Sequence, residues 1–269
     1  MRPQNFCCAQ ISTFILVEHF TGRICDSKTT SYTGRLNYIR LQLRPHCCRS
    51  VISNCFVYTL DLANCTGHNM AVRCDPLLVS LIGHSFIRRL RDFMADNTDS
   101  TNQNLGLYCD QYEVSCVARG GLTVNKLCSC PQFTQFTRCP DIVFIQIGGN
   151  DLVCDTPNIP KLVRDIISYA SYLKDGCGVR RVIIGQVLPR DPRRSTRTFN
   201  EDVVRLNLSL ASACAELCNI TFWKHRGFWA TMDFLAADGV HIRSDLDGYY
   251  LRKYRQSIKS AILHVSKSL

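Results

Sequence analysis

Three residues have side chains that could work together as a nucleophile, its base and an acid that orients the base: Ser85, His241 and Asp238. A serine hydroxyl is a poor nucleophile until a neighbouring base removes its proton. Asp238 precedes His241 by three residues, and Gly239 between them makes a turn easy, so the carboxylate can reach one ring nitrogen. That contact would fix the tautomer of the ring and stabilise its protonated form. The sequence therefore predicts a catalytic triad.

Attack by Ser85 on a carbonyl group creates a tetrahedral oxyanion, which needs hydrogen-bond donors. The sequence offers three: the backbone N–H groups of Ser85 and Gly121, and the side-chain amide of Asn150. Glycines are expected beside such a site, because a side chain would block the approach of the carbonyl group, and Gly120 and Gly149 fit this expectation. The loss of one such donor typically raises the barrier by about 2.7–4 kcal/mol.

Each of these motifs has an ordinary structural alternative. Ser85 could be a helix N-cap, the Gly-Gly pair at 120–121 a bend, and the Gly-Gly-Asn-Asp at 148–151 a turn. The Asp-x-x-His at 238–241 could be a solvated loop. The prediction depends on their conjunction, since all of them come after a predicted strand or lie in a late loop.

The segments that must position these residues alternate between apolar strands and helices of ordinary length. Strands are predicted at 77–82, 112–118, 141–147, 179–188 and 220–223, and helices at 85–93, 158–174, 200–217 and 246–265, with a polar surface loop at 96–104. This alternation is typical of an α/β domain with a parallel sheet and helices on both faces. Such sheets gather ligand chemistry at the carboxyl ends of their strands. We predict one domain over residues 75–269.

The chain resembles the SGNH (GDSL-type) hydrolase family. The family's four blocks correspond to Ser85 in Gly-His-Ser, Gly121 in Gly-Gly-Leu-Thr, Asn150 in Gly-Gly-Asn-Asp, and Asp238 with His241 in Asp-Gly-Val-His. The stretches IGHSFIRRL, IQIGGNDL and VIIGQVLPR are similar to esterase-like SGNH domains of animal genomes, some of them retrotransposon-associated. The resemblance covers Leu77 to the C-terminus. It implies a three-layer α/β/α flavodoxin-like fold and hydrolysis of carboxylic, short-chain or acetyl esters, with no metal and no organic cofactor.

An α/β-hydrolase fits less well, because its nucleophile elbow requires G-x-S-x-G and Ile87 stands where the second glycine would be. One position departs from the SGNH pattern. The family usually has Asp before the serine, whereas this chain has His84. Adjacent side chains at such a turn point apart, so we do not expect His84 to replace His241. The departure keeps open a second hypothesis, a catalytically degenerate SGNH domain that binds an acetylated, lipid or nucleic-acid ligand without turnover.

Residues 1–74 show no sustained period and are predicted to be a poorly ordered, irregular extension. They carry eight Lys or Arg against three Asp or Glu, and eight of the seventeen cysteines. Nucleic acid is therefore a possible partner beside the lipid, carbohydrate or other small ester substrate, and a solvated surface is the alternative. No C-x-x-C spacing supports a zinc site. The apolar stretch 11–17 is too short for a secretory signal, so we expect a cytoplasmic protein with reduced thiols, with secretion as the alternative. No apolar run is long enough for a membrane-spanning helix.

Two further segments near the predicted site are rich in aromatic or basic residues. Residues 222–229 could form a pocket wall for an acyl chain or pack in the core, and the histidine among them, His225, is expected to be exposed and without a role. The basic loop 190–197 contains four arginines. It is expected to be solvated, with contact to a phosphate group as the alternative.

Overall fold

The structure is a computed structural model that describes residues 75–96, 103–154, 156–229 and 231–269. The predictions made for residues 1–74 lie outside these ranges, as does most of the predicted loop 96–104. The domain boundary at residue 75 and the localisation therefore stay predictions. None of the helices in the described ranges is long and apolar enough to cross a membrane.

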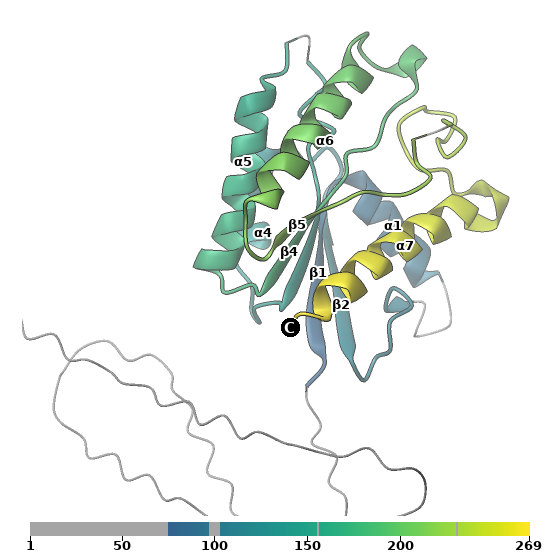
Figure 1. Ribbon diagram of the computed structural model, residues 1–269. Helices are drawn as coiled ribbons and strands as arrows, with labels where there is room; N and C mark the ends of the chain where they lie inside the picture. The colour runs from purple at the N-terminus through teal and green to yellow at the C-terminus, as the bar shows by residue number, and fades with distance from the viewer. Residues whose placement is uncertain (1–74, 97–102, 155, 230) are drawn as a thin grey trace, which may run out of the picture. The chain divides into compact units, whose positions relative to one another are not determined.

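The described residues form a parallel five-stranded sheet with the strand order β2-β1-β3-β4-β5 (Figure 1). Its strands are β1 (Leu77–Gly83), β2 (Tyr112–Ala118), β3 (Ile142–Gln146), β4 (Arg181–Gly185) and β5 (Ile220–Trp223). The first strand in the sequence, β1, is an inner strand; the second, β2, is at the edge, and the third, β3, pairs with the other side of β1. The predicted parallel α/β sheet is confirmed.

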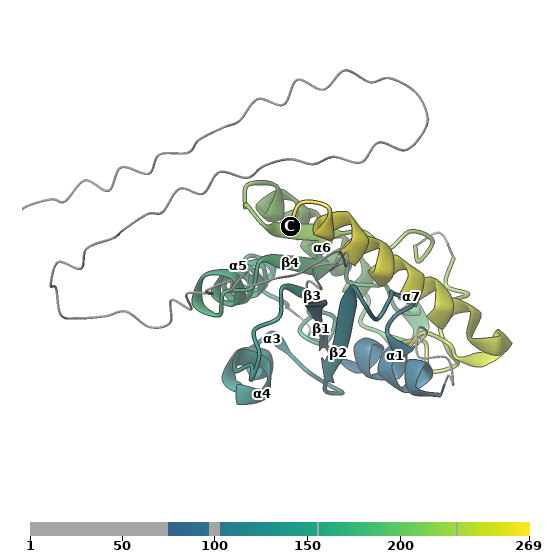
Figure 2. The same cartoon turned by 90° about the horizontal axis from the view of Figure 1, so that it is seen from below.

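Helices cover both faces of this sheet, so the molecule has three layers (Figures 1 and 2). One face carries α1 (Ser85–Ala95) and α7 (Asp245–Ser266), and the other carries α3 (Val124–Ser129), α4 (Pro131–Thr134), α5 (Ile159–Ser171) and α6 (Phe199–Ala215). Side chains alternate along β1: Leu81 packs in the core beneath α1 and α7, and its neighbour Ile82 packs in the core beneath α5 and α6. Both faces are buried, which explains why the central strands read as continuous apolar runs.

The structure differs from the sequence-based prediction in several elements. The short helices α3 and α4 were not predicted; each is too short to show a helical period. The predicted strand 179–188 pairs only from Arg181 to Gly185. Beyond Gly185 the side-chain amide of Asn207 binds both the N–H and the C=O of Val187, at 2.9 Å each, and so takes the place of a neighbouring strand.

A buried polar network lies at the carboxyl end of β3. The side chain of Gln146, fully buried, donates from Nε2 to the carbonyl of Gln186 at 2.9 Å. Its Oε1 therefore faces the other way, where the hydroxyl of Tyr254 in α7 donates to it at 3.0 Å and the ring Nε2 of His225 lies 3.2 Å away. This network links β3 and β4 to the segment after β5 and to α7.

The expectation that His225 is exposed is wrong, because its exposed fraction is 1%. Since Oε1 of Gln146 can only accept, Nε2 of His225 carries the proton and donates to it. Nδ1 then accepts from the hydroxyl of Ser257 at 2.9 Å, and that hydroxyl oxygen accepts in turn from Nε1 of Trp223 at 3.1 Å. Every polar group of the ring is thus satisfied in the neutral form.

We predict that His225 makes the domain sensitive to acid. Burial lowers the pKa of His225 to about 3, so this side chain binds a proton in the unfolded chain but not in the folded one as the pH falls below about 6.5. The contribution of the neutral ring to the free energy of unfolding is complete above that pH and is lost progressively toward pH 3. Between pH 7 and pH 5 this lowers the free energy of unfolding by about 2 kcal/mol.

Urea unfolding at these two pH values tests this prediction. The His225→Gln variant should be less stable than wild type at pH 7 but lose about 2 kcal/mol less on acidification. An equal loss in wild type and the His225→Gln variant would show that the ring titrates alike in both states.

Candidate active site

Ser85 lies where β1 turns into α1. Gly83 ends the strand and His84 is the N-cap of the helix, so Ser85 is the first helical residue. The turn is fixed by two backbone bonds, from the N–H of His84 to the carbonyl of Gln146 at 3.2 Å and from the N–H of Arg119 to the carbonyl of Gly83 at 3.1 Å. In the described part of the chain the N–H of Ser85 has no acceptor, as expected of a first helical residue. It is thus free to bind an anion.

The hydroxyl of Ser85 is hydrogen-bonded to His241, with 2.9 Å between Oγ and Nε2. On the other side of the ring, Nδ1 lies 2.7 Å from Oδ2 of Asp238. An ionised carboxylate only accepts, so Nδ1 carries the proton and Nε2 presents its lone pair to the hydroxyl. The structure therefore brings together the three residues predicted to form the triad.

The carboxylate of Asp238 is held in its ionised form by its own turn. Its Oδ1 accepts hydrogen bonds from the backbone N–H groups of Val240 and His241, at 2.9 Å each. Partial burial acts to raise the pKa of Asp238, but these two bonds and the contact with the ring outweigh it, and the pKa lies well below its usual range. The guanidinium of Arg89 lies 3.7 Å from Oδ2. A negative charge next to Nδ1 is what a base that becomes an imidazolium requires.

The loop that carries His241 is closed by backbone pairing. Leu235 and Ile242 form an isolated antiparallel bridge, and the N–H of Arg243 donates to the carbonyl of Phe234 at 2.9 Å. Leu235 and Ile242 are both buried in the core beneath α1 and α7. His241 thus projects from an anchored loop.

The two other predicted oxyanion donors belong to adjoining loops. Gly121 has a φ of +65°, and a Cβ atom built there would meet nothing within 4 Å, so its backbone borders open space. No acceptor for its N–H is found among the described residues. The side-chain amide of Asn150 donates to the carbonyl of Leu122, the next residue, at 2.9 Å. This bond joins the Gly121 loop to the Asn150 loop. The side-chain amide of Asn150 has two N–H groups, so its second N–H is still available as a donor.

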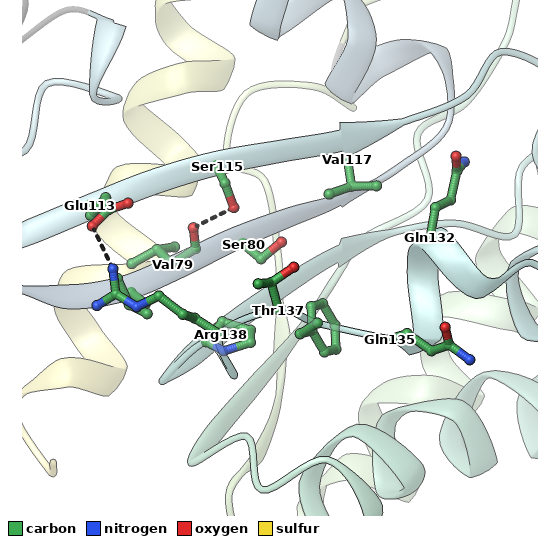
Figure 3. A pocket seen from close by; sticks show the side chains of 12 residues that line it. Val79, Ser80, Glu113, Ser115, Val117, Gln132, Gln135, Thr137 and Arg138 are labelled. Atoms are coloured by element: carbon green, nitrogen blue, oxygen red, sulfur yellow. Dashed lines mark hydrogen bonds and ion pairs between the residues drawn. The ribbon is translucent and has the colours of Figure 1, made fainter.

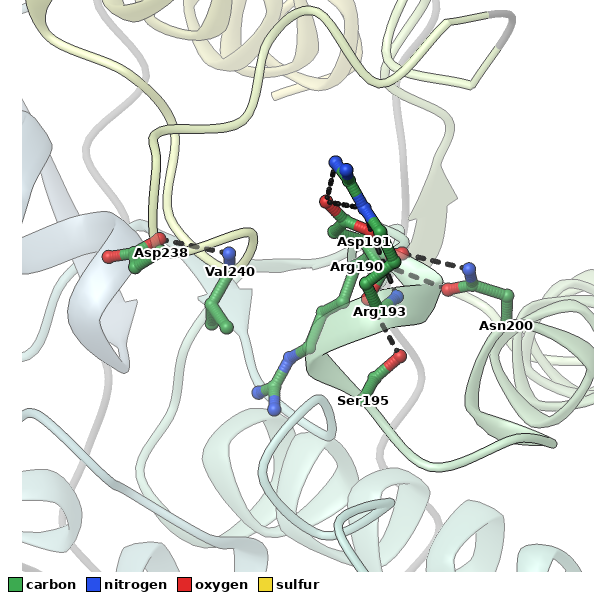
Figure 4. Close-up of polar contacts among 7 residues, drawn as sticks. All are labelled: Arg190, Asp191, Arg193, Ser195, Asn200, Asp238 and Val240. Carbon is green, nitrogen blue, oxygen red and sulfur yellow. Dashed lines mark hydrogen bonds and ion pairs between the residues drawn. The ribbon is translucent and has the colours of Figure 1, made fainter.

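Sequence reasoning missed the role of Arg190. The loop 190–197 was expected to be solvated throughout, and Arg193 is indeed exposed, paired with Asp191 (Figure 4). Arg190 instead extends away from them in Figure 4. Its residue is half-buried, and its guanidinium is hydrogen-bonded to Asn150. Four arginines in one loop carry no pattern that distinguishes the inward-facing one.

His84, which stands where the family usually has Asp, is buried and does not contact the hydroxyl of Ser85. Its Nδ1 accepts from the N–H of Phe86 at 3.4 Å and so caps α1. Burial, then the charge of Arg190 and then that of His241, lower the pKa of His84 to about 3. A neutral histidine therefore replaces a residue type that is usually charged, and the capping function is kept.

Two of the hollows on the described part of the domain bear on the sequence-based predictions. One is bordered by β1, β2 and the segment after α4 (Figure 3); within it the hydroxyl of Ser115 donates to the carbonyl of Val79 at 3.3 Å. It contains none of the predicted site residues. The other lies between α6 and the end of β5 with the residues after it, and Leu208, Phe222 and Trp229 make it largely apolar. Of the two alternatives for segment 222–229, core packing applies to Phe222 and Trp223, which pack against the cores on opposite faces of the sheet.

Comparison with solved structures finds several proteins that share this fold. The chain superposes on an acetylxylan esterase from Geobacillus stearothermophilus with a TM-score of 0.51 and 16% identity, covering 69% of this chain and 94% of that one. It superposes on a proposed acylhydrolase from Bacteroides fragilis with a TM-score of 0.51 and 19% identity, over 72% and 92% of the two chains. A family 3 carbohydrate esterase from Talaromyces cellulolyticus gives a TM-score of 0.50 and 16% identity, over 72% and 99%.

No protein-family model and no curated protein matches the sequence. At these identities the structural likeness establishes the fold. The three-layer α/β fold expected from the resemblance to SGNH hydrolases is confirmed, and the likeness to retrotransposon-associated domains stays a prediction.

We predict that two glycines of the site respond differently to replacement by alanine. A Cβ at Gly83 would lie 2.6 Å from the carbonyl oxygen of Gln146 and 2.8 Å from Ile87, so Gly83→Ala forces apart two buried strands and should cost more than about 3 kcal/mol. Gly121→Ala meets open space and should cost about 1–2 kcal/mol for its left-handed backbone alone. Urea unfolding measures both, and equal losses would contradict the assignment of a steric constraint at Gly83.

Proposed function

We propose that this chain is a serine esterase of the SGNH type that hydrolyses carboxylic esters, with acetyl and other short-chain esters as its substrate class. The observation that carries the proposal is the continuous hydrogen-bonded path from Ser85 through His241 to Asp238. The structural neighbours with the same fold are esterases and an acylhydrolase by name, which supports the choice of ester substrates.

In this mechanism Oγ of Ser85 attacks the ester carbonyl while its proton passes to Nε2 of His241. The negative charge that develops on the carbonyl oxygen is met by the N–H groups of Ser85 and Gly121 and by the amide of Asn150. The intermediate collapses, and the alkoxide leaves with the proton from Nε2. Water then gives a proton to His241 and attacks the acyl-enzyme, and the acid is released with Ser85 restored.

The first prediction from this mechanism concerns the nucleophile. Ser85→Ala should lower kcat on a short-chain activated ester by more than about 1,000-fold, and a fluorophosphonate probe should label wild type but not this variant. Ser115→Ala is a matched control, because that hydroxyl lies on β2 and its hydrogen bond within the described residues is to the backbone carbonyl of Val79. Folded wild-type protein that neither takes the probe nor exceeds Ser85→Ala on any acyl length would refute the esterase and favour the binding-module hypothesis.

The second prediction concerns the acid. In Asp238→Asn the amide can keep the turn but presents an N–H group to the ring, which favours the tautomer with a proton on Nε2. We expect kcat to fall about 1,000- to 10,000-fold, as in serine proteases, with little change in thermal stability. The measurement is steady-state kinetics beside thermal unfolding. A fall below about tenfold would mean that Asp238 does not orient the base.

A further inference from the structure

Arg190 makes two hydrogen bonds to the loop that carries Asn150. Its Nη2 donates to the carbonyl of Gly149 at 3.0 Å and to Oδ1 of Asn150 at 3.1 Å. The same nitrogen and Nε2 of His84 both lie within 4 Å of the position that a Cβ of Gly149 would occupy. The guanidinium of Arg190 therefore lies inside the site, between the Asn150 loop and the turn that precedes Ser85.

These bonds complete the hydrogen bonding that determines how the Asn150 amide is oriented. Nδ2 donates one N–H to the carbonyl of Leu122, and Oδ1 receives the guanidinium of Arg190. With one contact at each end, the amide can neither flip nor swing. The second N–H of Nδ2 is then the one polar group of this side chain that has no partner within the described residues, and its direction is set by the other two contacts.

Arg190 is itself held in place by two residues at the start of α6. The side-chain amide of Asn200 binds its backbone at both groups, accepting from the N–H at 3.0 Å and donating to the carbonyl at 2.8 Å (Figure 4). Its guanidinium lies 4.6 Å from the centre of the Phe199 ring, at cation–π distance. Arg193, three residues later, has a side chain that is 87% exposed and, among the described residues, is hydrogen-bonded to Asp191 alone. The structure fixes one arginine and leaves the other at the surface.

We propose that Arg190 is a positioning residue for Asn150: its guanidinium holds the amide oxygen so that the free N–H meets the oxyanion formed at Ser85. This inference rests on the proposed esterase function. Preorganised donors contribute most when they need not reorient as the charge develops. The positive charge next to the amide also polarises that N–H and strengthens it as a donor to an anion.

A double-mutant cycle tests the proposal, with Ser85-dependent activity of wild type established first. Arg190→Met should lower kcat about 10- to 100-fold with less than a twofold change in KM, because it loosens a group that acts in the transition state. Asn150→Ala should lower kcat about 100- to 1,000-fold. In the Asn150→Ala background, Arg190→Met should change kcat less than twofold, since the group that it positions is gone.

Matched variants separate positioning from general stability. Arg193→Met removes a neighbouring arginine with the same chemistry and should leave kcat unchanged, whereas Asn200→Ala should reproduce part of the effect of Arg190→Met. Arg190→Lys keeps the charge but not the planar fork, and should recover part of kcat. If Arg190→Met lowers kcat equally with and without Asn150, or not at all, the positioning role is refuted.

A readout independent of turnover covers the case in which no activity is found or Arg190→Met unfolds. The side-chain amide of Asn150 is assigned in ¹H–¹⁵N NMR spectra as the pair of signals missing from Asn150→Ala. Arg190→Lys, and Arg190→Met where it is folded, should move this pair towards the values of free amides, and Arg193→Met should leave it in place. An unmoved pair in the folded Arg190 variants would overturn the proposal whatever the outcome for the esterase.

Discussion

The hydrogen bond between Ser85 and His241 joins two residues that are 156 positions apart. The contacts around it position either the hydroxyl of Ser85 or the ring of His241. On one side, β1 and α1 hold the hydroxyl at a turn pinned to β3 and to the residue after β2. On the other side, the bridge between Leu235 and Ile242 holds the loop, and Asp238 holds the ring. A bond of this kind is made only if both supports are rigid to a fraction of an ångström.

The buried network around Gln146 gives the nucleophile side its rigidity. The carbonyl of Gln146 accepts from His84 at the base of the turn, while its side chain connects β3 to Tyr254 and His225. A buried polar network favours a single arrangement when every polar group in it has a hydrogen-bond partner. Here the hydroxyl of Tyr254 and Nε2 of His225 both donate to Oε1 of Gln146. The neutral His84 fits this environment, because a second cation beside Arg190 in a buried position would be costly.

The sequence predicted the sheet and the triad contact well because both depend on local patterns. Apolar runs ended by glycines marked the strands. The loops that leave the carboxyl ends of parallel strands share one edge of the sheet, so Ser85, Asn150 and His241 could be placed near one another. The positions of Arg190 and His225 could not be predicted. Whether an arginine or histidine points inward depends on partners such as Gln146, at the end of β3, or Asn150, in the loop after it. These partners are far away in the sequence and leave no periodic signal near the arginine or histidine.

Residues 190 and 191 connect the two halves of the site through successive positions of one loop. The side chain of Arg190 binds the Asn150 loop, and the backbone N–H of Asp191 donates to the carbonyl of Gly239 at 2.8 Å, within the turn that carries Asp238. Surface loops ordinarily tolerate insertions and deletions. Here a change of even one residue in length after Pro189 would displace the contacts to the Asn150 loop and to the Asp238 turn together. The length of this connection is therefore constrained at both sides of the site, although Arg193, Arg194 and Arg197 are exposed to water.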